Sequence, residues 1–290
     1  MKRLRVLLVI FAIAVFAVYG VYLVRDKMTS DYVAPVITAD ADSILASVQA
    51  SDQELMSGLS ATDNLDGDVT GSLVLVSKSK FVQDGTRYVN YAAFDNNKNV
   101  GTYTRTLTYT DYVSPRFSVS QPLRFLSGSS NQDYLRNITA HDCLDGDITK
   151  QIMITYGAHG AISDTIMGQT VNLQVTNSAG DTETLELVFT EEDYNSFYQQ
   201  SPSLSEYLVY VHPGEKPDYR ALLNGIWSGN NTRSFSDSEF NLYEDVWIDD
   251  SRVDYYTAGV YQVTYTLSRL RGDEVRETLG TAVLNVVVEA

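Results

Sequence analysis

The chain is poor in the residue types that most often provide cross-links or catalysis. It has one cysteine, Cys143, among 290 residues, so no disulfide can form within it. Its three histidines, His141, His159 and His212, show no metal-ligand spacing with one another or with the cysteine. Basic residues are also scarce, since 21 Lys and Arg against 37 Asp and Glu give a net charge of −16. Because a surface of this sign repels phosphates, we expect no nucleic-acid partner.

Sequence motifs of enzymes are missing as well. The chain contains no Gly-x-Ser-x-Gly, no Gly-x-Gly-x-x-Gly and no phosphate-binding P-loop. Glycoside hydrolysis would need two carboxylates that the fold brings together, and no pair among the 37 acidic residues stands out by position. We therefore predict a protein that is not an enzyme, with no catalytic residues and no organic cofactor.

A long apolar run lies near the start of the chain, from Val6 to Val24. At about 1.5 Å per residue, a helix of this length crosses the hydrocarbon core of a bilayer. The bases before the run are Lys2, Arg3 and Arg5, and the charges directly after it are Arg25, Asp26 and Lys27. The excess of positive charge before the run predicts a cytoplasmic N-terminus and an extracellular remainder. We predict that residues 1–30 are the cytoplasmic tail and membrane anchor of a single-pass protein.

A cleaved signal peptide is the alternative interpretation of this run. The residues Val18–Gly20 are small or tolerated where a signal peptidase cuts. However, the apolar run continues past Gly20 and is longer than a usual signal-peptide core. We favour an uncleaved signal-anchor, and the alternative stays open.

Two motifs occur twice in the rest of the chain, nearly the same distance apart. Ala61–Thr70, with the sequence ATDNLDGDVT, recurs as AHDCLDGDIT at Ala140–Thr149. Likewise, DYVAP at Asp31–Pro35 recurs as DYVSP at Asp111–Pro115. Two separate motifs that recur with one period indicate a duplicated structural unit of about 80 residues.

Turn residues and short alternating runs of apolar and polar residues follow each copy of these motifs, and similar runs occur in the last part of the chain. Val100–Thr110 and Gly259–Leu267 are examples of the two-residue period that is typical of half-buried strands. The predicted fold class is all-β, with tandem β-sandwich domains after one N-terminal transmembrane helix. The predicted divisions are domain 1 at 31–110, domain 2 at 111–192, a polar linker at 193–206, and domain 3 at 207–290. Domain 3 has no Asp-Gly-Asp and is interpreted as a diverged relative.

The repeated motifs resemble the bacterial immunoglobulin-like domain found in Gram-positive surface proteins and pesticidal crystal toxins. That family carries Ala-x-Asp-x-x-Asp-Gly-Asp-(Val/Ile)-Thr, which Ala61–Thr70 and Ala140–Thr149 match almost fully. Its later segment, Gly-x-Tyr-x-Val-x-Tyr-x-Ala-x-Asp-x-x-Gly-Asn, is similar to Gly85–Asn99, with Lys98 at the usual glycine. The resemblance covers 31–190 well and 207–290 loosely. It implies seven-stranded immunoglobulin-like sandwiches that act as spacers or binding units.

The repeated acidic motifs have two interpretations. Clustered carboxylates are the ligands that Ca²⁺ prefers, and Asp31 or Asp111 would complete such a site if the turn faces a domain boundary. Alternatively, the motif is a structural turn in which Gly67 and Gly146 take a positive φ and aspartates bind backbone N–H groups. The candidate calcium ligands are Asp63, Asp66, Asp68, Asp142, Asp145 and Asp147.

Aromatic residues of domain 3 are candidate ligand contacts. In segments with little alternation, they would stack on sugar rings or bind protein if they were exposed in one plane. The alternative is that they belong to the core or are scattered over the surface. The candidates are Trp227, Trp247, Tyr255 and Tyr256.

These observations predict a membrane-anchored bacterial surface protein that uses its modules for adhesion or binding. The expected partners are the membrane, through the N-terminal helix, and a cell-wall or capsule glycan or another surface protein. A scaffold or accessory subunit of an envelope polysaccharide assembly or export system is the alternative function. A hydrolase based on domain 3 is less favoured, because the domain is small for an enzyme.

Overall fold

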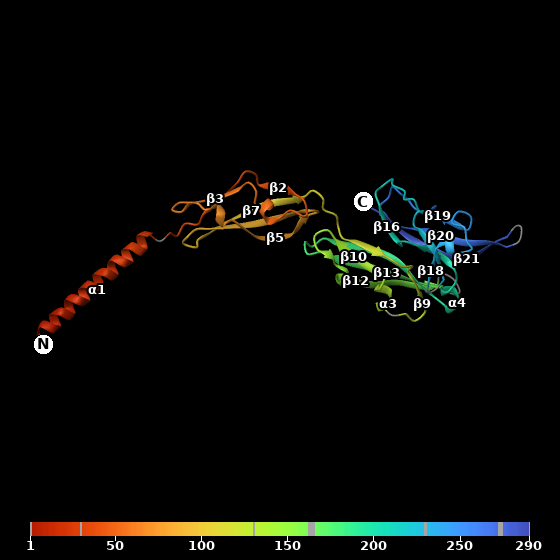
Figure 1. Ribbon diagram of the computed structural model, residues 1–290, viewed down its shortest axis with the longest axis horizontal. Helices are drawn as coiled ribbons and strands as arrows, with labels where there is room; N and C mark the ends of the chain where they lie inside the picture. Colours follow the sequence, from red (N-terminus) through yellow and green to blue (C-terminus); the bar gives the residue numbers. More distant parts are fainter. Residues whose placement is uncertain are drawn as a thin grey trace. The chain divides into compact units, whose positions relative to one another are not determined.

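The computed structural model describes residues 2–29, 31–129, 131–161, 166–228, 231–271 and 275–289. The chain divides into two compact units, a first unit at 1–112 and a second unit at 113–290. Apart from one long N-terminal helix, the described residues form mostly antiparallel sheets, arranged as sandwich-like pairs (Figure 1). The fold class that the sequence predicts is thereby confirmed.

The N-terminal helix α1 runs from Lys2 to Thr29. Its segment Leu7–Arg25, 19 residues with a mean hydropathy of 2.7, is long and apolar enough to cross a membrane and is not buried inside the protein. An N-terminal signal sequence would have the same two properties. The side chains of Lys2, Arg3, Arg5 and Lys27 lie outside the described residues, so the orientation of the helix in a membrane stays a prediction.

The first sandwich pairs a three-stranded sheet with a four-stranded sheet. The smaller sheet has the order β1-β3-β4, formed by Val36–Ala39, Leu59–Asp63 and Gly67–Asp68. The larger sheet has the order β2-β7-β6-β5, formed by Ser43–Ala46, Val100–Tyr109, Thr86–Phe94 and Val74–Gln83. A short helix, α2 (Asp52–Leu55), and a 3-10 turn, η1 (Thr70–Ser72), connect strands.

The second sandwich repeats this plan. Its smaller sheet has the order β11-β10-β8, formed by Gly146–Asp147, Ile138–Asp142 and Arg116–Val119. Its larger sheet has the order β12-β13-β14-β9, formed by Met153–Ala161, Ile166–Thr176, Thr182–Glu192 and Arg124–Leu126. The connecting pieces are α3 (Asn131–Leu135) and η2 (Thr149–Gln151).

The third sandwich follows the plan again, although its sequence lacks the Asp-Gly-Asp motif. Its smaller sheet has the order β15-β17-β18, formed by Ser201–Leu204, Leu223–Trp227 and Thr232–Arg233. Its larger sheet has the order β16-β21-β20-β19, formed by Leu208–Val211, Val275–Val288, Gly259–Arg271 and Val246–Asp249. The 3-10 turn η3 (Phe235–Asp237) lies between β18 and β19.

All three sandwiches have the same strand order and the same mixed pairing. In each, the second strand pairs parallel with the last strand, as β2 with β7, β9 with β14 and β16 with β21. Each described sandwich has seven strands, the number that the family resemblance implies. The third domain therefore has the same topology as the other two, although its sequence matches theirs only in part.

Equivalent core positions explain why such different sequences form the same sheets. Alternate residues of the sixth strand point into each sandwich, so Val89 and Tyr91 are fully buried in β6. Val263 and Tyr265 occupy the same places in β20 and are equally buried. Each tyrosine keeps its hydroxyl satisfied by donating to a backbone carbonyl, that of Leu55 for Tyr91 and that of Tyr219 for Tyr265.

Strand β5 forms one edge of the larger sheet in the first sandwich. Its pairing with β6 is interrupted by three register shifts, the first between Leu75 and Ser77 and the other two next to Phe81. Lys78 and Lys80 stand on this irregular strand. The edge is therefore neither flat nor apolar.

The segment 193–206, which the sequence predicts to be a linker, is instead part of the folded second unit. Asp193 caps the short helix α4 (Tyr194–Phe197) by accepting from the Ser196 N–H. All four residues of β15 are buried, and the strand pairs with β17. The sequence signal fails here because Ser201, Pro202 and Ser203 are polar or strand-breaking residues, and an edge strand tolerates them where a central strand would not.

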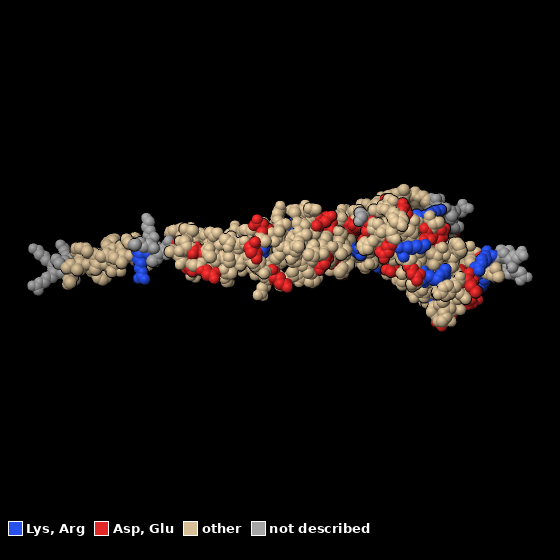
Figure 2. Space-filling view, turned by 90° about the horizontal axis from the view of Figure 1, so that it is seen from above, with Lys and Arg blue, Asp and Glu red and all other residues tan. Residues whose placement is uncertain are grey.

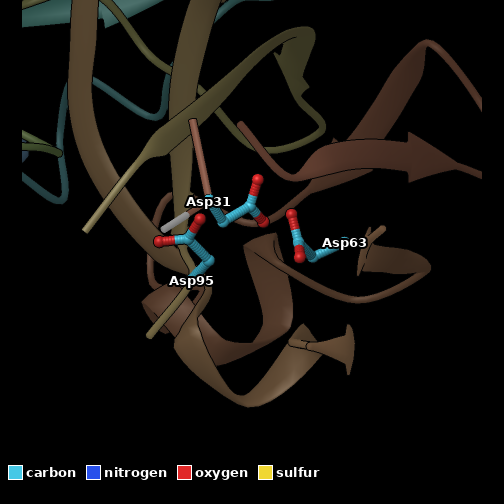
Figure 3. Close-up of side chains that lie close together, drawn as sticks. All are labelled: Asp31, Asp63 and Asp95. Atoms are coloured by element: carbon cyan, nitrogen blue, oxygen red, sulfur yellow. The ribbon is translucent and has the colours of Figure 1, made fainter. Parts of the chain in front are cut away.

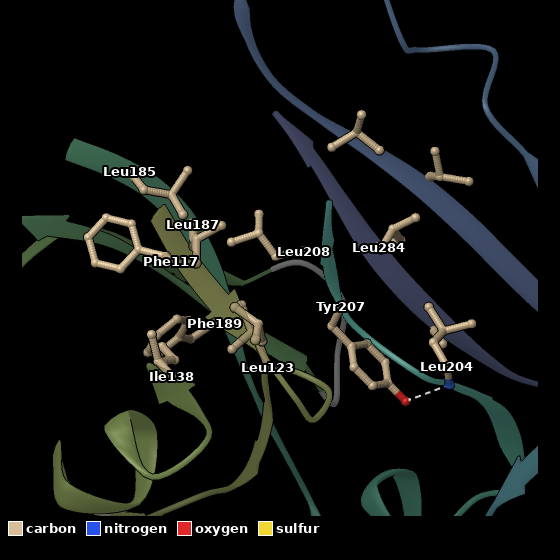
Figure 4. Close-up of a cluster of buried hydrophobic side chains, with 14 of the residues drawn as sticks. Phe117, Leu123, Ile138, Leu185, Leu187, Phe189, Leu204, Tyr207, Leu208 and Leu284 are labelled. Carbon is tan, nitrogen blue, oxygen red and sulfur yellow. Dashed lines mark hydrogen bonds between the residues drawn. The ribbon is translucent and has the colours of Figure 1, made fainter. Parts of the chain in front are cut away.

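The second and third sandwiches share one continuous hydrophobic core, which extends from Phe117 to Val288 along the chain. Figure 4 shows Tyr207 and Leu208 between the side chains of the second sandwich and Leu284 of the third. Backbone hydrogen bonds join the two as well, since the Tyr207 N–H donates to the Val119 carbonyl. The Tyr207 hydroxyl accepts from the Leu204 N–H at 3.0 Å. The second unit is thus a pair of sandwiches built around a single core.

Candidate functional site

Three carboxylates converge at one end of the first sandwich. Asp31, Asp63 and Asp95 each offer one oxygen, and these oxygens lie within 4.8 Å of one another. The residues come from three separate segments: the chain that follows α1, the end of β3, and the turn after β6. Figure 3 shows the carboxylates of Asp31 and Asp63 facing each other, with Asp95 beside them. We call these three residues the carboxylate cluster.

Asp31 is buried, with only 6% of its surface exposed. Its Oδ1 accepts from the Val33 N–H at 2.9 Å, an Asx turn that fixes the side chain. Its Oδ2 is buried and has no hydrogen-bond partner. A buried carboxylate oxygen without a donor is unfavourable, so a cation or a hydrogen-bond donor at this atom would stabilise the fold.

Asp63 is held by the turn that its own motif forms. Its Oδ1 accepts from the N–H groups of Leu65 and Asp66, both at 2.9 Å. The N–H of Asp66, followed by that of Leu65, lowers the pKa of Asp63, so the side chain is a carboxylate at neutral pH. Its Oδ2 is buried without a partner, like that of Asp31.

Asp95 begins the turn between β6 and β7. Its Oδ1 accepts from the Asn99 N–H at 2.7 Å and its Oδ2 from Asn99 Nδ2 at 2.6 Å. The same Nδ2 group donates to the Asp31 carbonyl at 3.1 Å, which ties the incoming chain to this turn. Lys98 takes a positive φ of 70° in this turn. Glycine adopts such a φ without strain, which explains why the bacterial immunoglobulin-like family usually has glycine at this position.

The other acidic residues of the first motif fasten turns and do not join the cluster. Asp66 accepts from the N–H and the Nδ2 of Asn96, at 2.8 and 2.6 Å. Asp68 accepts from the Thr70 N–H at 2.9 Å and is exposed. Gly67 takes a positive φ of 72°, as the structural-turn interpretation requires. Of the three carboxylates that the first motif offers, only Asp63 reaches the cluster.

The second sandwich has the same turn with one decisive difference. Asp142, the counterpart of Asp63, accepts through Oδ1 from Leu144 and Asp145 N–H groups and is 1% exposed. Its Oδ2 accepts from Asn177 Nδ2 at 3.0 Å, and Asn177 stands where the first sandwich has Asp95. An amide donor thus satisfies the oxygen that is unpartnered in Asp63.

The remaining candidate ligands of the second motif also hold turns. Asp145 accepts from the N–H and the hydroxyl of Ser178, and Asp147 from the Thr149 N–H. Asp111, the counterpart of Asp31, accepts from the Ser47 hydroxyl and the Val48 N–H in the first unit. Among the described residues, no second group of three metal-ligating side chains was found.

The four candidate aromatic residues do not form one platform. Trp227 is half-buried in β17 of the smaller sheet, while Trp247 stands 70% exposed on β19 of the larger sheet. Tyr256 is 81% exposed in the loop that precedes β20. Tyr255 is half-buried, and its hydroxyl donates to Asp250 at 2.7 Å and lies 2.8 Å from that of Tyr219. Burial, followed by the bond to Asp250, raises the pKa of Tyr255, so it stays protonated.

A groove of about 480 Å³ lies in the second unit, where β14 of the second sandwich meets β20 and β21 of the third. Its walls combine amide and hydroxyl side chains with apolar ones. Among the lining residues are Thr190, Gln199, Gln262, Thr281, Val283 and Asn285. Nothing in the sequence points to this groove, because its residues come from strands far apart in the chain.

Charge is unevenly distributed over the visible surface. In Figure 2, Asp and Glu dominate the exposed charges of the first sandwich, while Lys and Arg gather on part of the second unit. This distribution agrees with the net charge of −16 and offers no basic strip of the kind that tracks a nucleic-acid backbone on the face shown.

No protein-family model and no curated protein matches this chain. A solved structure of the carbohydrate-binding module CBM51-2 with INT domains from Clostridium perfringens ZmpB, in complex with GlcNAc, is 18% identical. The match covers 52% of this chain and 26% of that one, with a TM-score of 0.21. The lipoprotein BT2262 from Bacteroides thetaiotaomicron is 16% identical over 53% of this chain and 80% of its own, with a TM-score of 0.19.

Human CDH23 EC21-23 is 13% identical over 88% of this chain and 100% of its own, with a TM-score of 0.21. Identities and TM-scores this low carry no argument about a ligand or an activity. The function must therefore be argued from the residues of this chain.

Proposed function

We propose that the protein is a non-enzymatic, single-pass membrane protein that holds three β-sandwiches on the outer side of a bacterial cytoplasmic membrane for binding. The observation that carries this proposal is the helix α1, whose apolar segment Leu7–Arg25 is long enough to cross a membrane and is not buried inside the protein. A helix that is apolar on all sides cannot remain in water, whereas a bilayer of matching thickness accommodates it. The sandwiches that follow it then have a fixed attachment point.

The direction of insertion can be tested with single cysteines. In a Cys143→Ser background, Val82→Cys puts a thiol on the first sandwich at a position where the native side chain is 55% exposed. We expect a membrane-impermeant maleimide to label Val82→Cys on intact cells, because the excess of bases before the span keeps the N-terminus inside. The matched control is Arg3→Cys, which we expect to be labelled only after the membrane is permeabilised.

Either of two results would contradict this assignment. One is labelling of Arg3→Cys on intact cells, with Val82→Cys protected. The other is a mature chain in the culture medium that lacks the first 20 residues, which would make the run a cleaved signal peptide.

Within this function, we place the ligand in the groove of the second unit, and we propose an envelope polysaccharide as that ligand. Sugars offer many hydroxyls and a few apolar ring faces. The groove offers matching partners in the exposed side chains of Gln199, Gln262 and Thr281, next to the apolar side chain of Val283. Its volume of about 480 Å³ lies within the range of pockets that bind small ligands or a few sugar rings.

Filling the groove should abolish this binding. We expect the full-length protein in detergent to co-sediment with isolated cell-wall polysaccharide. Thr281→Trp should abolish this co-sedimentation, because the indole ring would obstruct the groove. Thr184→Trp is the control, since it adds the same bulk at another exposed threonine of the second unit, on β14 outside the groove lining. Equal binding by both variants would remove the groove from the proposal, and no binding by the wild-type protein would remove the polysaccharide.

A further inference from the structure

We propose that Asp31, Asp63 and Asp95 bind one Ca²⁺ ion, which fastens the chain that leaves the membrane helix onto the first sandwich. This inference does not depend on the ligand of the second unit. It rests on the charge of the cluster, on its two buried oxygens without partners, and on a comparison with the equivalent place in the second sandwich.

The carboxylate cluster lacks the positive charge that it needs. Asp31 and Asp95 are only 6% and 7% exposed, so water compensates their charge poorly. Within the described residues, no Lys, Arg or His side chain forms an ion pair with any of the three aspartates. Like charges this close raise the free energy of the folded state unless a cation or a proton lies between them. A divalent cation would neutralise most of this charge at once.

The two unpartnered oxygens lie where an ion would use them. The Oδ2 atoms of Asp31 and Asp63 are both buried and without a hydrogen-bond donor, although the other oxygen of each side chain is held by backbone N–H groups. The fixed Oδ1 atoms hold the carboxylates in place, and the free Oδ2 atoms remain for a ligand. Fixed orientation with unused acceptors is the arrangement of a metal site before the metal binds.

The second sandwich shows what replaces the ion when one carboxylate is lost. There Asn177 stands in place of Asp95, and its Nδ2–H donates to Asp142 Oδ2, the atom equivalent to the unpartnered Oδ2 of Asp63. Asp111, in place of Asp31, makes its bonds elsewhere. The same turn therefore exists in two forms. In the second sandwich an asparagine of the protein donates to the buried oxygen, and in the first sandwich the equivalent oxygen has no donor and is free to bind a cation.

The composition and burial of the cluster favour Ca²⁺ over Mg²⁺. Oxygens that bind Ca²⁺ at about 2.3–2.6 Å lie as far as about 5 Å apart on opposite sides of the ion. The three oxygens of the cluster all lie within 4.8 Å of one another, close enough for one Ca²⁺ ion to contact them together. Mg²⁺ keeps several of its waters and usually binds through one or two carboxylates, so a cluster of three carboxylates, two of them buried, suits Ca²⁺ better. Water would complete the coordination of Ca²⁺ on the open side of Asp63, which is partly exposed.

The position of Asp31 gives the ion a structural role. This residue is two positions beyond Thr29, the last residue of α1, and it precedes β1. An ion shared with Asp63 and Asp95 would tie this entering segment to the turns after β3 and β6. Calcium would then determine whether the stretch between the membrane and the first sandwich is ordered.

The proposal is tested by calcium binding to the full-length protein in detergent, freed of metal with a chelator. We expect calorimetric titration with CaCl₂ to show one ion per chain, with a dissociation constant of about 10⁻⁴–10⁻³ M, as in other extracellular modules. We also expect hydrogen exchange of the backbone amides in residues 31–36 to slow when Ca²⁺ is added. MgCl₂ at the same concentration should produce neither effect.

Three substitutions separate a true site from a general attraction of cations. Asp95→Asn and Asp63→Asn should each weaken binding by more than about 10-fold, since even partners outside the direct ligands contribute that much. Asp95→Asn should fold, because the second sandwich uses asparagine at the same place. Asp68→Asn is the control: it removes one charge from an exposed aspartate of the same turn and should leave binding unchanged.

The proposal would be overturned if the wild-type protein bound no calcium up to about 10 mM, well above the range expected for such modules. It would also fail if Asp68→Asn weakened binding as much as Asp95→Asn, because calcium would then be attracted by the acidic surface in general. Finally, calcium bound without slower exchange at 31–36 would place the ion elsewhere.

Discussion

Replacing Arg124 by methionine should lower the free energy of unfolding of the second unit by about 3–5 kcal/mol. Arg124 forms a two-pronged ion pair with Glu192, through Nε at 2.8 Å and Nη2 at 2.6 Å. It also donates to the Ser196 carbonyl and the Ser201 hydroxyl, so it connects β9 and β14 with the start of the third sandwich. The Glu192 side chain is only 4% exposed, so the substitution would leave a buried carboxylate without its partner.

Chemical denaturation of the full-length protein in detergent, followed by tryptophan fluorescence, measures this change, because Trp227 and Trp247 both belong to the second unit. The double variant Arg124→Met/Glu192→Leu should recover most of the loss, since it removes both charges. Arg136→Met is the control: that arginine is 74% exposed and pairs with Asp133 at the surface, so a change below about 1 kcal/mol is expected. If Arg124→Met behaved like Arg136→Met, the buried pair would have no role in stability.

Replacing Leu284 by alanine should destabilise the second sandwich as well as the third, where the residue lies. Leu284 is fully buried in the core that the two sandwiches share, and a leucine-to-alanine change in a core costs about 2–5 kcal/mol. Because one continuous core unfolds cooperatively, the whole second unit should lose this stability together. Native-state hydrogen exchange with mass spectrometry should show faster exchange in β13 of the second sandwich and in β20 of the third.

Leu270→Ala is the matched control for this experiment. Leu270 is on β20 but 55% exposed, so its truncation should leave exchange in both sandwiches nearly unchanged. A result in which Leu284→Ala speeds exchange only within the third sandwich would contradict a common core, and the two sandwiches would then be independent domains.

Local patterns were sufficient to predict much of the fold. The alternation around Val89, Tyr91, Val263 and Tyr265 reports directly on which side chains enter the sandwich, because the side-chain period of a strand is two. The repeated turns were equally readable, since Gly67 and Gly146 both take the positive φ that their position in the motif suggests. Strand β15 escaped prediction because burial of Ser201 and Ser203 depends on partners distant in the chain.

The candidate site was only partly predictable for the same reason. The motif includes Asp63 among its acidic candidates, but it could not tell which aspartates join the carboxylate cluster and which only form turns, because both roles select aspartate. Asp66 accepts from Asn96 and lies outside the cluster, whereas Asp95, which is not part of the repeated motif, belongs to it. Convergence of three segments is a property of tertiary structure. The only local hint was the repeated Asp31 motif, which marks where the chain enters each of the first two domains.

The interrupted edge strand β5 would matter most if the helix α1 holds the protein at a membrane, as proposed. Molecules tethered in two dimensions meet their neighbours far more often than the same number in solution, and open strand edges are where such neighbours would join into fibres. The three register shifts and the lysines of β5 present an irregular, charged border to a neighbouring copy. Copies crowded on such a membrane would therefore be protected from polymerising through this edge.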